Sequence, residues 1–278
     1  MTATTEDLAR ATGWPLVVNS VLASTFGVVG ALLVDLVGRM VAAELAGLDP
    51  VLYHNRVELT GANDLALAGG ALASLLAGGF FLAVYPGSRD HDAGRMAVLW
   101  LILHCFRQGF VPMALAPLSE DSDMSRALVA LDLPGGIDVI VGAAGAAGLL
   151  LISLAAAPAF LAFASHQRDI STPQKRAAFV LRVAVVPGIA GGILAVPFFI
   201  PDAGTGLVPA LPTFGLFTLA TLLAALGTKS VEIRRDAAMT PRFSWALGAT
   251  LVVTMLVFRF ALSRGIPIPP DPETFFFK

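Results

Sequence analysis

The residues best suited to chemistry stand inside or beside apolar runs of the chain. Asp35 and Arg39 follow a stretch that carries no charge from Ala11 to Val34, and Glu44 continues the same helical rhythm. In a helix, residues four apart lie on one face, one turn from each other. An acid and a base this close to hydrocarbon are costly unless they are paired or face a polar cavity. We therefore treat Asp35 and Arg39 as the centre of a polar membrane cluster.

The third apolar run, Met96–Leu118, carries Arg107 near its middle and His104 one turn earlier. A lone arginine at that depth needs a partner, and we expect Asp35 to supply it. The next acids that could serve are Glu44, Asp121 and Asp123. Two interpretations follow: a buried ion pair that locks the two helices together, or a proton or ion pathway built from Asp35, His104 and Arg107.

Several cofactor chemistries are excluded by residue type. A retinal Schiff base needs a lysine within a helix, yet all three lysines stand outside the apolar runs: Lys175, Lys229 and Lys278. A haem held between two helices needs two histidines at membrane depth, and only His104 qualifies. Walker, dinucleotide-binding and Gly-x-Ser-x-Gly motifs are absent from the sequence. We expect no cofactor and no metal.

The composition is that of an integral membrane protein. Of 278 residues, 56% are hydrophobic and 14% are charged, whereas about a quarter of residues are charged in soluble domains. The net charge of −2 provides no basic surface for nucleic acid. The expected partners are the lipid bilayer and a protein partner in the membrane.

The apolar runs predict an all-α polytopic bundle of about seven transmembrane helices, each near the ~20 residues that cross a bilayer. The segment between the first two, Pro50–Gly61, alternates between apolar and polar residues and predicts a short β-hairpin. The predicted spans are Leu16–Val34 with a continuation to Ala46, Leu65–Val84, Met96–Leu118, Val139–Ala164, Val183–Ile200, Leu207–Gly227 and Phe243–Ala261.

The loops predict an orientation. Ser165–Arg182 and Thr228–Arg242 each carry four Lys or Arg residues, whereas Pro201–Thr213 carries none. Cationic loops stay on the cytoplasmic side. The expected arrangement is a bacterial cytoplasmic membrane with the N-terminus inside and the C-terminus outside.

The tail, residues 264–278, differs from the rest of the chain. Its four prolines favour an extended conformation, and three consecutive phenylalanines follow them. We expect the tail either to lie along the membrane interface or to dock on another protein. Its candidate binding residues are Pro269, Pro270, Phe275, Phe276 and Phe277.

The sequence also resembles a known family. Asp35–Gly47, DLVGRMVAAELAG, resembles the signature of site-2-protease-like intramembrane zinc metalloproteases, in which His-Glu-Leu-Gly-His opens a small-residue helix. The Gly/Ala-rich Leu65–Gly78 is similar to the family's Ala-Gly-Pro helix. Phe106–Asp123 looks like the later helix and turn that end in an acidic metal ligand. The resemblance covers about residues 16–135. It suggests a three-helix core (1–135), a four-helix extension (136–263) and the tail (264–278).

The departures from the family motif decide the expected function. Asp35 and Arg39 stand at the two zinc-binding histidines, and Leu36 stands at the catalytic glutamate. A guanidinium cannot ligate zinc, and a leucine cannot activate a metal-bound water. The resemblance therefore implies a degenerate, pseudoprotease-like member in which Arg39 takes the place of the metal, neutralised by Asp35, Asp121 or Asp123.

Three functions follow from these residues. The first is a non-catalytic binding, scaffolding or accessory subunit of a membrane complex. The alternative is an ion or small-solute transporter or channel that uses Asp35, His104 and Arg107. The third is an active metalloprotease with substituted ligands.

Overall fold

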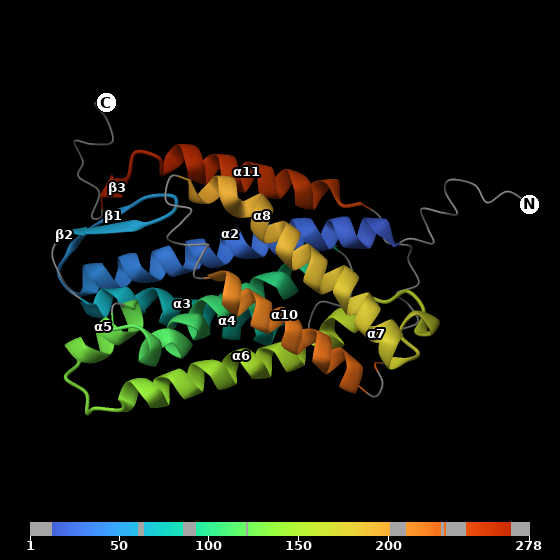
Figure 1. Ribbon diagram of the computed structural model, residues 1–278. Coiled ribbons are helices and arrows are strands. Elements are labelled where there is room, and N and C mark those ends of the chain that lie inside the picture. Colours follow the sequence, from blue (N-terminus) through green and yellow to red (C-terminus); the bar gives the residue numbers. More distant parts are fainter. Residues whose placement is uncertain are drawn as a thin grey trace, which may run out of the picture.

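The computed structural model of the chain describes residues 13–60, 64–85, 93–120, 122–200, 210–228, 231 and 243–267. Helices run back and forth between two ends of the molecule (Figure 1). The helix α2, Trp14–Leu45, is the longest of the described helices and packs against α3, α4, α8 and α11. It is therefore the element around which the other helices are arranged.

Five of the described helices are long and apolar enough to cross a membrane. They occupy the first five predicted spans: α2, α3 (Asp64–Val84), α4 (Ala93–Leu115, extended by the 3-10 turn Ala116–Leu118), α6 (Ile137–Leu161) and the continuous α7–α8 segment Pro173–Phe199. Two further apolar helices, α10 (Ala210–Gly227) and α11 (Trp245–Ala261), fall in the sixth and seventh predicted spans. The architecture is consistent with an all-α membrane bundle.

The fifth of these helical segments begins ten residues earlier than its apolar run. The helix α7, Pro173–Val180, starts where the Thr172 hydroxyl accepts a hydrogen bond from Lys175 N at 3.3 Å. A capping threonine followed by proline at the first helical position favours a helix start. Part of the predicted cationic loop is therefore helical.

The end of α2 is fixed by Gly47. This residue has a φ of 74°, a conformation that costs glycine little because it lacks a Cβ. Leu48 N then donates to Ala43 O at 3.1 Å, and Gly47 N donates to Glu44 O at 3.0 Å. This Schellman arrangement satisfies the last carbonyl groups of the helix.

A small antiparallel sheet follows α2. The strands β1 (Asp49–Leu52) and β2 (Val57–Thr60) pair with Val51 opposite Glu58. The short β3 (Ile266–Pro267) pairs with the other edge of β1. The residues that follow α11 are thus held beside the residues that follow α2.

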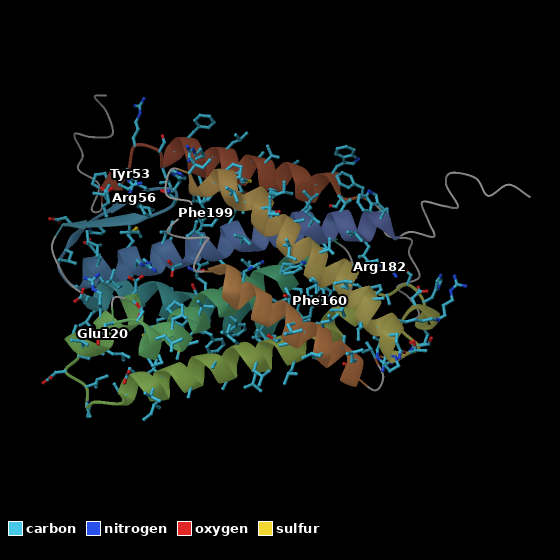
Figure 2. The ribbon with its side chains drawn as sticks, in the orientation of Figure 1. Tyr53, Arg56, Glu120, Phe160, Arg182 and Phe199 are labelled. Carbon is cyan, nitrogen blue, oxygen red and sulfur yellow. The ribbon has the colours of Figure 1, made fainter. Side chains whose placement is uncertain are left out.

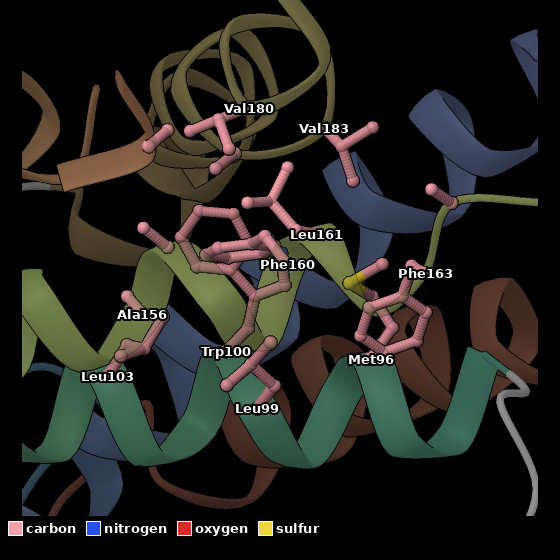
Figure 3. Close-up of a cluster of buried hydrophobic side chains, with 14 of the residues drawn as sticks. Met96, Leu99, Trp100, Leu103, Ala156, Phe160, Leu161, Phe163, Val180 and Val183 are labelled. Carbon is pink, nitrogen blue, oxygen red and sulfur yellow. The ribbon is translucent and has the colours of Figure 1, made fainter. Parts of the chain in front are cut away.

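The largest buried apolar cluster lies between α4, α6 and the α7–α8 segment (Figure 3). Trp100 and Phe160, both fully buried, have ring centroids 5.1 Å apart. Val180 and Val183 cover them from the α7–α8 segment. This packing fixes the position of α4.

A polar chain crosses the same region. Trp100 Nε1 donates to Ser20 Oγ at 2.9 Å, and Ser20 Oγ donates to Val183 O at 2.5 Å. Val183 belongs to η4, a π-helical segment at Leu181–Val185. Because Pro187 has no N–H, it cannot bond the carbonyl four residues earlier. The Ser20 hydroxyl supplies a donor to Val183 O in place of the N–H that Pro187 does not have.

Candidate functional site

The centre of the site is a guanidinium held between two carboxylates. Arg39 Nε donates to Asp35 Oδ2 at 2.9 Å, and Arg39 Nη1 donates to Asp123 Oδ2 at 2.7 Å. The Asp35 side chain is 3% exposed, that of Arg39 is 24% exposed and that of Asp123 is 37% exposed. The cluster therefore runs from the bundle interior toward its surface. Arg39 has the neutralising acids that the sequence predicts.

Close helix contact positions Asp35. A Cβ added to Gly38 would lie 2.6 Å from Gly69 O, so α2 and α3 touch backbone to backbone at this crossing. A Cβ added to Gly70 would lie 2.2 Å from Asp35 Oδ1. Glycines at these positions let the helices approach and leave room for the carboxylate. The Gly/Ala-rich composition of α3 thus has a specific role at the ion pair.

Asp123 is placed by a short helix after α4. It is the first residue of α5 (Asp123–Ala130), and the preceding Ser122 caps that helix by accepting from Ser125 N at 3.2 Å. Arg126 of α5 forms an ion pair with Asp64, the first residue of α3. The cap sets where α5 begins, and the ion pair fastens it to α3, so Asp123 faces Arg39.

Arg107 does not take part in this cluster, so the expected Asp35–Arg107 ion pair is wrong. Asp35 is already bound by Arg39, its neighbour one turn along α2. Within the described residues, Arg107 has no ion pair or hydrogen bond, and its Nε is occluded without a hydrogen-bond partner. The local pair forms because helix geometry brings residues four apart together.

His104 lies in a separate polar environment. It is 2% exposed, and its ring stacks on Trp100 with centroids 5.4 Å apart. Its Nε2 lies 3.4 Å from Ser24 Oγ. No hydrogen bond or ion pair joins Asp35 to His104 or Arg107 in the part of the chain that the structure describes. The three candidate pathway residues are thus not linked through Asp35.

The remaining predicted site residues are distributed differently. Glu44 is exposed near the end of α2 and forms no ion pair with a described residue. Asp121 and residues 268–278 of the tail lie outside the described residues. The tail positions concerned include Pro269, Pro270, Phe275, Phe276 and Phe277.

A second polar cluster was not predicted. His54, in the turn between β1 and β2, is 5% exposed, and its Nε2 lies 3.1 Å from Ile200 O and 2.6 Å from Arg259 Nη1. Asn55 Nδ2 donates to Phe199 O at 3.0 Å. A guanidinium only donates hydrogen bonds, and Arg259 also donates to Ile200 O. These side chains cap the end of α8.

The chemistry open to the Asp35–Arg39–Asp123 cluster is electrostatic. Leu36, one residue after Asp35, is 3% exposed and packs in a core cluster with Phe198. Among the described residues, no group of three or more His, Cys, Asp or Glu side chains could hold a metal ion. The cluster offers a fixed cation between two carboxylates. No protein-family model, curated protein or solved structure matches this chain.

Proposed function

We propose that this chain is a pseudoprotease-like membrane protein that acts as a non-catalytic binding, scaffolding or accessory subunit. One observation carries the proposal: the Arg39 guanidinium bridges Asp35 and Asp123. The metalloprotease resemblance implies metal ligands in two segments of this chain: the helix that begins at Asp35 and the turn that ends at Asp123. In this chain those two segments meet at a permanent cation, which takes no part in metal ligation.

Zinc binding by a reverted motif tests the family part of this proposal. The triple variant Asp35→His, Leu36→Glu and Arg39→His is expected to bind one zinc ion per chain, because two imidazoles and the Asp123 carboxylate form a known type of zinc site. Adding Asp123→Asn should abolish this binding. A folded triple variant that binds no zinc, or that binds it equally well without the Asp123 carboxylate, contradicts the proposed ancestry.

Purification from native membranes tests the accessory role. We expect the tagged full-length chain, extracted into nanodiscs after mild crosslinking, to carry another membrane protein in fixed stoichiometry. A chain that runs alone under several extraction conditions, with its fold intact by circular dichroism, contradicts the role.

We further propose seven spans in a bacterial cytoplasmic membrane, with the N-terminus inside. The cationic segment with Arg168, Lys175 and Arg182 at one end supports this orientation. Arg56 and Arg126 lie at the other end, where each is paired with an acid. Arg182 and Glu120 are labelled at these opposite ends in Figure 2. Single cysteines are introduced in a Cys105→Ser background. A cysteine at position 182 should be labelled by an impermeant reagent from the cytoplasmic side, and one at position 120 from the outer side. The reverse pattern contradicts the orientation.

A further inference from the structure

Arg107 is a cation near the middle of a membrane helix whose counter-ion is not among the described residues. It stands twelve residues after Arg95 and thirteen before Glu120. At ~1.5 Å per residue this places it close to the centre of a hydrocarbon core ~30 Å thick. Asp35, the acid that the sequence predicts as its partner, is bound by Arg39 instead. The chain therefore holds an arginine where an uncompensated charge is most costly.

The half of α4 that carries Arg107 is less covered than the other half. Of residues 96–105, all but Val98 and Leu101 are buried, whereas of residues 106–115 only Gly109 is. Phe106 and Phe110 stack at 5.8 Å on this half, and both are partly exposed. Arg107 itself keeps part of its surface accessible, although its Nε is occluded. Phe106 packs beside Gly78 of α3 and Phe110 beside Gly148 of α6, so Arg107 is the charged side chain on the less buried half of α4.

We infer that Arg107 is a docking point for a carboxylate carried at mid-membrane depth by a transmembrane helix of a partner protein. Lipid phosphates lie ~15 Å from the bilayer centre, half the thickness of the hydrocarbon core. A membrane-embedded Asp or Glu meets a central cation at its own depth, and charged groups within membranes pair in this way. The inference rests on the proposed accessory function and names the chemistry of the partner.

Two single-span peptides test the inference with the purified full-length chain in phosphatidylcholine liposomes. The peptides are identical apolar sequences of ~20 residues, with a central Glu in one and a central Gln in the other. Binding is measured by energy transfer from a dye on the peptide to a dye at the N-terminus of the chain. We expect the Glu peptide to bind at least about tenfold more tightly, the size of effect that close charge pairs produce at interfaces.

Arg107→Gln should remove this preference, and Arg182→Gln should leave it unchanged, because Arg182 is exposed toward one end of the bundle and donates to Ala178 O within its own helix. Equal binding of the two peptides by the wild-type chain overturns the inference, as does a Glu preference that survives Arg107→Gln. Oleate that binds through Arg107 while the peptides show no difference assigns the site to a fatty acid instead.

Thermal stability gives a second, independent readout. If the counter-ion comes from a partner, Arg107→Met should leave the melting temperature of the isolated chain unchanged or raise it. A fall as large as that caused by Arg39→Gln means that Arg107 is paired within the chain, which also overturns the inference. Neither result depends on the native-membrane purification, so failure of the accessory role and failure of this inference remain distinguishable.

Discussion

Replacing Arg39 by glutamine is expected to destabilise the bundle more than replacing either acid that it binds. The variant leaves the Asp35 carboxyl, 3% exposed, without its cation. Removing one partner of a buried ion pair costs ~3–5 kcal/mol because the other charge stays buried. The half-exposed Asp123 adds little, since ion pairs of this kind contribute ~0–1 kcal/mol. We expect a loss of ~3–5 kcal/mol in the free energy of unfolding.

Asp35→Asn should cost less than Arg39→Gln. The guanidinium keeps its bond to Asp123 and has 24% of its side chain exposed, so the loss is that of one charged hydrogen bond, ~1.5–3 kcal/mol. In the Asp35→Asn background, Arg39→Gln no longer leaves a buried carboxylate and should cost only ~0–1 kcal/mol. The double-mutant cycle should therefore be strongly non-additive.

The measurement is equilibrium unfolding in mixed micelles, followed by circular dichroism. Arg126→Gln is the matched control, because the Arg126–Asp64 pair has 47% and 34% of its side chains exposed and should contribute ~0–1 kcal/mol. An Arg39→Gln loss no larger than that of the control, or an additive cycle, refutes the reasoning.

Two further predictions concern the contacts that hold the bundle around this site. Gly70→Ala should destabilise the protein by ~1–3 kcal/mol, because its Cβ would meet the Asp35 carboxylate. Gly79→Ala, in open space on the same helix, should instead raise the free energy of unfolding by ~0.5–1 kcal/mol. Equal effects of the two variants in the unfolding assay contradict this prediction. Ser20→Ala should cost ~1–3 kcal/mol by removing the hydroxyl that donates to Val183 O and accepts from Trp100 Nε1. In a Pro187→Ala background, where a backbone N–H can reach that carbonyl, the cost of Ser20→Ala should shrink, and an unchanged cost contradicts the account of the π-helical segment.

The parts of the structure that the sequence predicts are those with local signals. The first helix follows from an uncharged run that Gly47 ends, and the Asp35–Arg39 pair follows from helical spacing. The family resemblance predicts Asp121 or Asp123 as the second acid, and the structure shows Asp123 on Arg39. These features depend on residues near one another in the chain or on a known motif.

The parts that sequence reasoning missed depend on distant residues. Arg259 meets His54 across 205 positions, and Ser20 meets Val183 across 163. No periodicity links such residues. A usable signal exists only for the second pair, because Pro187 frees a buried carbonyl that must find a donor elsewhere. The predicted Asp35–Arg107 pair is wrong for the opposite reason. Asp35 has a local partner, because Arg39 lies one turn away on the same helix.

The most direct test of the central claim is the zinc content of the purified wild-type chain after incubation with zinc and removal of excess ion. A guanidinium fixed between Asp35 and Asp123 leaves no set of neutral ligands, so we predict no stoichiometric zinc by elemental analysis. One zinc ion per chain, lost on Asp123→Asn, would contradict the claim that Arg39 occupies the centre of the site.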